Sequence, residues 1–113
     1  AIAVPARVTL TVNRRALRNG QSARFSGKLL GGFVPRGGRE LELQGYNPLK
    51  GRWQPVRTQG LRTSRTGRWH TAYRFTSTIG TTVTYRFRVR VAPRPDHPFA
   101  EGFSRAVTVT VRG

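Results

Sequence analysis

The sequence predicts an all-β protein that folds as an antiparallel β-sandwich of about seven strands. Three observations lead to this prediction. Apolar and polar residues alternate in several short segments, which is the pattern of a strand with one buried face. Glycine, proline and asparagine lie between these segments, as in "RNGQ", "NPLKG" and "TIGT". No segment keeps a 3.6-residue apolar period over the length of a helix, and residues 13–20 suffice for one helical turn at most.

The expected strands, in chain order, are residues 7–12, 23–30, 39–46, 52–58, 68–75, 84–91 and 104–112. Each except 52–58 has one apolar and one polar face. Pro55 has no N–H to donate to a neighbouring strand, so 52–58 is expected at the edge of a sheet. The side chains expected to face the core are those of Val8, Leu10, Val12, Ala23, Phe25, Leu29, Leu41, Leu43, Trp69, Thr71, Tyr73, Phe75, Tyr85, Phe87, Val89, Val91, Val107, Val109 and Val111.

A single domain, residues 1–113, accounts for the chain, because a chain of this length hides about two-thirds of its unfolded surface around one modest core. The absence of cysteine excludes a disulfide framework and a thiolate metal site. The absence of methionine, even at position 1, indicates a processed or excised part of a longer chain. No apolar run approaches the roughly 20 residues that span a bilayer as a helix, so we expect no membrane insertion.

Six motifs follow one another in a familiar order: "FSGKLL" (25–30), "LELQGY" (41–46), "RWQPV" (52–56), "TSRTGRW" (63–69), "TYRFRVRV" (84–91) and "SRAVTVTV" (104–111). Their order resembles that of bacterial immunoglobulin-like modules, akin to carboxypeptidase-regulatory-like and transthyretin-like domains of secreted and surface proteins. One position departs from the family pattern, since Ser64 stands where its "T-D-x-x-G" step often has aspartate.

The resemblance implies an immunoglobulin-like topology, in which the first, second and fifth strands share one sheet and the third, sixth and seventh share the other. Tyr85 would then form a tyrosine corner, with its hydroxyl bonded to nearby backbone. The resemblance also implies a non-catalytic structural, adhesive or spacer module of a secreted or cell-surface bacterial protein. Its partners would be other domains of the parent chain.

Few residues are available for catalysis. The acids are Glu40, Glu42, Asp96 and Glu101, and the imidazoles are His70 and His97. Glu40 and Glu42 point to the same side of a strand, but the surrounding arginines make ion pairing their expected role. Asp96, His97 and Glu101 share a proline-rich stretch, which is expected to be a solvated loop rather than a metal site. We therefore expect no enzyme, no bound metal and no cofactor.

The net charge of +17 predicts attraction to polyanions, although a GC-rich genome also favours arginine codons without any ligand. If residues 39–46 lie beside 84–91, Glu40 and Glu42 face the outward row of Arg86, Arg88 and Arg90. Opposite charges on neighbouring strands contribute about 0.2–1 kcal/mol per pair. The other sheet has no acid, so it is the candidate polyanion-binding face, with outward residues Arg7, Arg24, Lys28, His70 and Arg74.

Two alternatives to the structural module follow. The first is an electrostatic binding module for an anionic polymer, such as an acidic glycan, an envelope polymer or nucleic acid. No aromatic residues interleave the outward arginines, which argues against a stacking groove for single strands, and no helix is expected to read bases. The second is a subunit of an extracellular filament, with residues 1–8 pairing with a neighbour's edge. Nothing in the sequence requires self-association.

Overall fold

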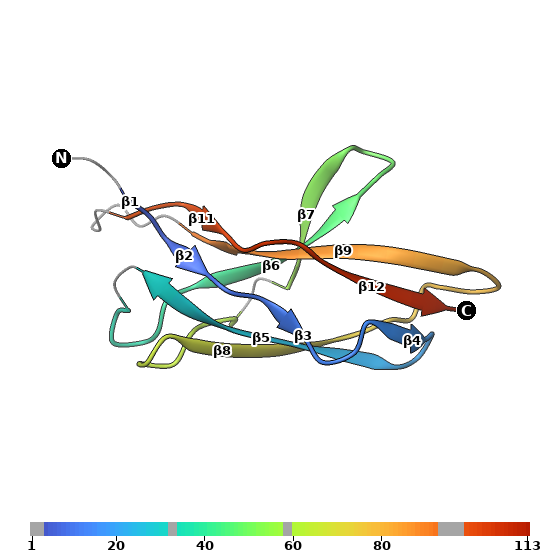
Figure 1. Cartoon of the computed structure of the whole chain (residues 1–113), viewed down its shortest axis with the longest axis horizontal. Helices are drawn as coiled ribbons and strands as arrows, with labels where there is room; N and C mark the ends of the chain where they lie inside the picture. The colour runs from blue at the N-terminus through green and yellow to red at the C-terminus, as the bar shows by residue number, and fades with distance from the viewer. Residues whose placement is uncertain (1–3, 32–33, 58–59, 93–98) are drawn as a thin grey trace.

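Two layers of strands face each other in the computed structural model, with β9 and β12 above β5 and β8 in the view of Figure 1. The structure describes residues 4–31, 34–57, 60–92 and 99–113. These residues form strands, turns and bends, and no helix is found among them. The prediction of an all-β protein is confirmed, and the two layers fit a β-sandwich.

The smaller sheet is built around β5 (Ser22–Gly31). On one side β5 pairs with β2 (Arg7–Val8) and β3 (Thr11–Val12), and on the other with β8 (Arg68–Arg74). All of these pairs are antiparallel, and the register shifts between Arg7 and Val8. The predicted first strand, residues 7–12, is interrupted at Thr9 and Leu10, which separate β2 from β3.

The larger sheet has the order β4–β12–β9–β6–β7, and its strands are β4 (Ala16–Arg18), β12 (Val107–Arg112), β9 (Thr82–Val91), β6 (Leu41–Asn47) and β7 (Arg52–Arg57). A further short strand, β11 (Gly102–Phe103), also pairs with β9. All pairs in this sheet are antiparallel except β4–β12, which is parallel. β7 lies at the edge, where Pro55 was predicted to place it.

The described residues contain twelve strands, more than the seven expected. Every expected strand is represented, and the additional ones are short. They include β4, which occupies part of the stretch expected to form at most one turn of helix, and a separate parallel pair of β1 (Val4–Pro5) with β10 (Phe99–Ala100).

The core lies between the two sheets and is built from alternate residues of the long strands. Phe25, Leu43, Val89 and Val109, one from each of four strands, are fully buried. The residues next to each of them along its strand face away from the core. Five aromatic rings meet in this core, contributed by Phe25, Tyr73, Phe75, Tyr85 and Phe87. Such ring pairs contribute about 0.5–1.5 kcal/mol each beyond the area that they bury. The period of two in the sequence therefore identified the buried face of these strands.

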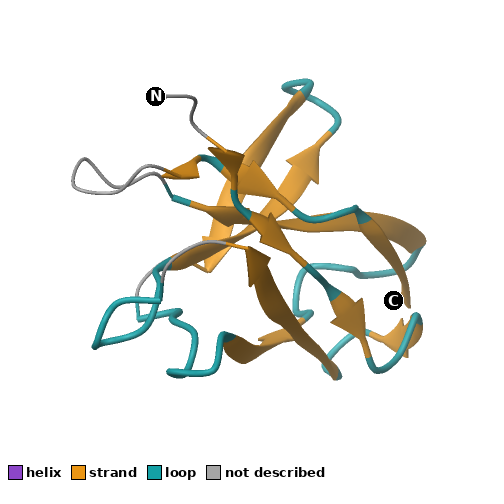
Figure 2. Ribbon diagram, turned by 60° about the vertical axis from the view of Figure 1, so that its left-hand side comes forward, coloured by secondary structure: helices purple, strands orange, loops and turns teal. Residues whose placement is uncertain are grey.

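The molecule is elongated, with principal extents of 52 × 28 × 20 Å. β1 lies at one end of the long axis and β12 finishes at the other, while the hairpin of β6 and β7 projects from the body of the sandwich (Figure 1, Figure 2). The buried Arg39 donates from Nη2 to the carbonyl oxygen of Ala92 at 2.8 Å, which links the segment before β6 with the end of β9. The described part of the chain contains no helix of the length and apolarity needed to cross a membrane.

Candidate polyanion-binding face

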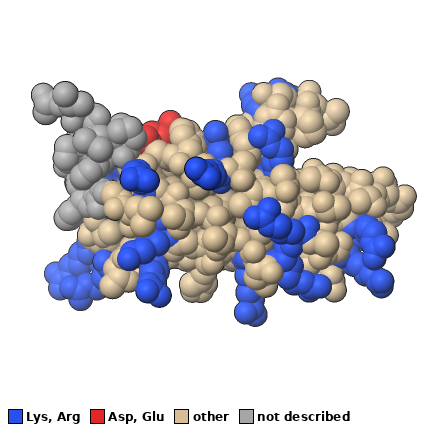
Figure 3. Space-filling model, viewed as in Figure 1, with Lys and Arg blue, Asp and Glu red and all other residues tan. Residues whose placement is uncertain are grey.

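The outward side of the smaller sheet carries exposed cations and no acid. We define the cationic face by its six basic residues: Arg7, Arg24, Lys28, Arg68, His70 and Arg74. Five of them were predicted from strand alternation. Arg68, the first residue of β8, is exposed on the same face opposite Lys28 and is added to them. In the view of Figure 3, basic side chains follow the lower edge, where β5 and β8 lie, and acidic atoms are seen only near β11 at the upper left.

The register of β5 and β8 brings like charges together on this face. Lys28 lies directly opposite Arg68, and Ser26 lies opposite His70. Like charges at directly opposed positions of an antiparallel pair destabilise the sheet. No acid on β2, β3, β5 or β8 offsets this repulsion, since none of these strands contains aspartate or glutamate. An anion placed over the face would relieve it.

An open hollow of about 590 Å³ lies on the cationic face. Hydroxyl groups line it beside the cations: Thr11 Oγ1 lies 3.2 Å from Ser26 Oγ, and Thr9 Oγ1 accepts a hydrogen bond from the backbone N–H of Lys28 at 2.8 Å. Hydroxyl, ammonium and guanidinium groups are the donors that bind phosphate and sulfate oxygens. The hollow therefore has the chemistry of an oxyanion-binding surface.

The arginines of the larger sheet are engaged by neighbouring side chains. Arg90 lies beside two carboxylates: its Nη1 is 3.9 Å from Glu42, and its Nε donates to Glu101. Arg88 donates from Nε to Gln44 Oε1 at 2.7 Å, and Gln44 in turn donates to Glu42 at 2.6 Å. Burial lowers the pKa of the Arg88 guanidinium from its ordinary value; the charge of Arg90 adds to this shift, and Glu101 and Glu42 oppose it.

Glu40 was expected beside the row of Arg86, Arg88 and Arg90, but it does not lie there. β6 begins one residue later, at Leu41, and Glu40 instead forms an isolated bridge with Arg62. Arg62 Nη2 donates to the Glu40 carboxylate at 2.6 Å. The Glu40 carboxylate therefore pairs with Arg62 and not with the arginines of β9. Beside Arg90, the second carboxylate is that of Glu101.

Aromatic rings do interleave the outward arginines, so the expectation that none would is wrong. The guanidinium carbon of Arg86 lies 5.0 Å from the ring centroid of Tyr46 and 5.4 Å from that of Trp53. That of Arg88 lies 4.5 Å from Trp53 and 4.1 Å from Phe103. These five residues form an arginine–aromatic stack across β6, β7, β9 and β11. The one signal in the sequence was the tight "NPLKG" turn, which pairs Tyr46 with Trp53.

Tyr85 was expected to bond nearby backbone as a tyrosine corner. Its hydroxyl instead lies 2.6 Å from Thr78 Oγ1, a side-chain oxygen. Thr78 is buried, and its backbone N–H donates to Asn19 Oδ1 at 3.1 Å. The tyrosine thus fixes the segment between β8 and β9 through a hydroxyl pair.

The residues that were considered for catalysis or metal binding are not brought together in the structure. Asp96 and His97 lie outside the described residues, Glu101 is paired with Arg90, and His70 is exposed on the cationic face. Among the described residues, no three histidine, aspartate or glutamate side chains are grouped so as to hold a metal ion. No protein-family model matches the chain, and no curated protein matches it.

Proposed function

We propose that the protein is a non-catalytic β-sandwich module that binds an anionic polymer through the cationic face. The observation that carries this proposal is the opposition of Lys28 and Arg68 on a sheet without a single acid. The hydroxyl-lined hollow beside them supplies further donors to an oxyanion. By contrast, Arg88 and Arg90 on the larger sheet are bonded to other side chains. On the cationic face only Arg74 has a side-chain hydrogen bond among the described residues, to the carbonyl oxygen of Gly20.

The ligand class follows from the spacing of the charges. Arg24 and Lys28 are four residues apart on β5, which is about 13 Å along a strand. A polymer with repeated sulfate, carboxylate or phosphate groups meets cations along the whole strand at once, whereas a small anion meets only immediate neighbours such as Lys28 and Arg68. Because the face is a flat sheet without a helix for a groove, binding follows charge rather than base sequence.

The test is binding to heparin and to DNA as a function of salt. The variant with Arg24→Ser and Arg74→Ser removes two charges from the cationic face, and the matched control with Lys50→Ser and Arg52→Ser removes two exposed charges from the β6–β7 hairpin. For DNA, log K falls linearly with log salt, and losing two phosphate contacts makes this negative slope less steep by about 1.8. We expect this loss only in the first variant.

Two results contradict the proposal. If both double variants weaken binding equally, the attraction follows net charge and the face has no special role. If the unmodified protein binds neither polymer at low ionic strength, there is no electrostatic binding module.

A structural or spacer role at a bacterial cell surface or in a secreted protein is the second candidate, and it is compatible with the first. It is supported by the position of β1 and the end of β12 at opposite ends of the 52 Å axis (Figure 1). The partition of β2, β3, β5 and β8 from β6, β9 and β12 supports an immunoglobulin-like assignment. A spacer stays monomeric in sedimentation velocity across a wide concentration range. Growth into long assemblies would instead favour the filament alternative.

A further inference from the structure

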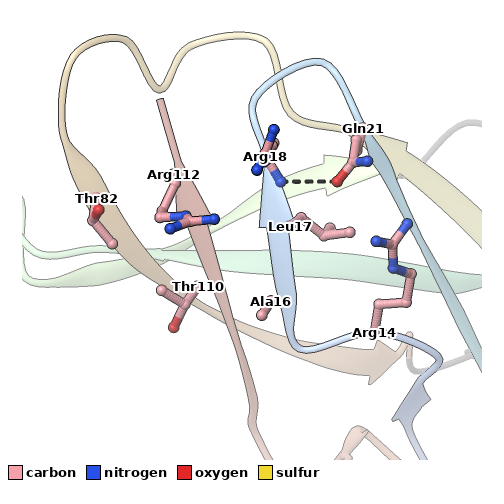
Figure 4. Close-up of a pocket in the computed structure, with 8 residues that line it drawn as sticks. All are labelled: Arg14, Ala16, Leu17, Arg18, Gln21, Thr82, Thr110 and Arg112. Atoms are coloured by element: carbon pink, nitrogen blue, oxygen red, sulfur yellow. Dashed lines mark hydrogen bonds between the residues drawn. The ribbon is translucent and has the colours of Figure 1, made fainter.

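A second group of arginines surrounds a pocket of about 340 Å³ at the end of the larger sheet where β12 finishes (Figure 4). We define the arginine triad as Arg14, Arg18 and Arg112. Arg18 comes from β4, Arg112 from β12, and Arg14 from the segment before β4. In Figure 4, Arg112 and Arg14 approach Leu17 from opposite sides. This pocket shares no residue with the cationic face.

The strand register places two members of the triad side by side. Arg112 lies directly opposite Arg18 across the parallel pair of β12 and β4, and Thr82 lies opposite Arg112 on β9. Neighbouring strands are about 4.8 Å apart, so two exposed guanidinium-bearing residues start from adjacent positions on the same face. None of the three guanidinium groups makes an ion pair or hydrogen bond with a described residue. This concentration of charge is therefore uncompensated within the described chain.

Backbone hydrogen bonds hold this arrangement in place. Thr110 donates to the carbonyl of Arg15 at 2.8 Å, and Asn19 donates to that of Arg112 at 2.7 Å, so β4 is bonded to β12 at both of its ends. The backbone N–H of Arg18 also donates to Gln21 Oε1 at 2.9 Å, as Figure 4 shows. Leu17, between them, is buried and anchors β4 to the core. The two arginines are thus kept adjacent by the fold and cannot separate at their Cα atoms.

We propose that the arginine triad binds one tetrahedral oxyanion, a phosphate or sulfate group. Each guanidinium offers a planar fork of N–H donors that matches two oxygens of such a group. The three side chains come from different segments of chain and line one pocket, so donors on different sides of the pocket suit a tetrahedral group better than a planar carboxylate. Thr82 and Thr110 line the same pocket, and because Thr110 Oγ1 lies 3.1 Å from Thr84 Oγ1, Thr82 supplies the further donor. The site is separate from the cationic face and does not depend on polymer binding.

The test is titration of the ¹⁵N-labelled protein with inorganic phosphate and with inorganic sulfate, followed by amide chemical shifts at constant ionic strength. We expect saturable shifts confined to the amides of residues 14–18, 82 and 110–112. Arg18→Gln and Arg112→Gln should each weaken binding about tenfold, while Arg105→Gln, which removes an exposed charge elsewhere, should leave it unchanged. Retention of the remaining spectrum shows that each variant is folded.

Further arms separate this site from the cationic face and identify its ligand. The variant with Arg24→Ser and Arg74→Ser should titrate with phosphate as the unmodified protein does, even where its polymer binding is lost. A phosphate monoester that binds at least as tightly as inorganic phosphate would assign the site to an esterified group, and weaker binding would assign it to the free ion. Shifts that spread over arginines throughout the chain without saturation, or an equal effect of Arg105→Gln, would overturn the proposal.

Discussion

The guanidinium carbon of Arg88 lies 4.1 Å from the ring centroid of Phe103. The same carbon also lies 4.5 Å from the ring centroid of Trp53. Phe103 is one of the few large apolar side chains that the sheet leaves exposed, yet it has a role as the terminal ring of the arginine–aromatic stack. The stack connects the projecting β6–β7 hairpin with β9 and β11, strands that belong to distant parts of the sequence.

Replacing Phe103 by leucine should lower the free energy of unfolding by about 1 kcal/mol, which is the usual size of a cation–π contact near a surface. Leucine keeps an apolar side chain beside Arg88 but has no ring. Urea unfolding measures the difference. Leu49→Ala is the control, because Leu49 is 96% exposed and should change stability by less than about 0.5 kcal/mol. Unchanged stability in Phe103→Leu would mean that the ring contributes nothing specific.

Glu42→Gln should destabilise the protein more than Glu40→Gln does. The side chain of Glu42 is 21% exposed and lies among Arg90 and Gln44, whereas that of Glu40 is 64% exposed. Hydrogen bonds to a partly buried charge contribute about 1.5–3 kcal/mol, against about 0.2–1 kcal/mol for an exposed pair. Thermal and urea unfolding of both variants give the comparison. An equal effect would show that the burial of Glu42 does not matter.

Gly27→Ala should destabilise the protein by about 3 kcal/mol or prevent folding, as overpacking against fixed backbone does. A Cβ at this position of β5 would overlap the carbonyl oxygen of Thr9 and lie 2.8 Å from Trp69 Nε1. The Thr9 backbone cannot move aside without breaking its N–H bond to the carbonyl of Lys28. Gly37→Ala is the matched control, since nothing lies within 4 Å of a Cβ there. Similar melting temperatures for the two variants would contradict the close approach of β5 to Thr9.

Tyr85→Phe should lower the free energy of unfolding by about 1–3 kcal/mol, because it leaves the hydroxyl of Thr78 buried without its partner. Thr78 is only 1% exposed, so water cannot replace the lost bond. Adding Thr78→Val to Tyr85→Phe removes the orphaned hydroxyl. The double variant should therefore cost less than the sum of the two single variants. Additive effects in this cycle would show that the two hydroxyls are not coupled.

The alternation of residues could predict the strands and their buried faces, because a side chain on a strand points to one side or the other with a period of two. Phe25 and Phe87 were assigned to the core on this basis, and both are buried there. The same reasoning placed Arg24 and Arg74 on an exposed face. These assignments need only the local pattern.

Contacts between strands could not be predicted in the same way, because they depend on register and on where each strand begins. Glu40 reaches Arg62 because β6 begins after it, and Phe103 reaches Arg88 through a two-residue strand with too few residues to show alternation. The opposition of Arg18 and Arg112 joins residues near the two ends of the sequence, through the three-residue β4. Neither β11 nor β4 carries a periodic signal long enough to read.

The parallel pairing of β4 with β12 also determines how the molecule would respond to stretching. A pull on β1 at one end and on the end of β12 at the other is carried along the chain to β4. It then draws β4 and β12 past each other along their length. The bonds from Thr110 to Arg15 and from Asn19 to Arg112 then bear the load together, because both lie across the direction of the force. A strand that is peeled away loses its bonds one at a time, whereas this pair must lose them at once. The short β4 would therefore resist the detachment of β12 when the molecule is stretched between its ends.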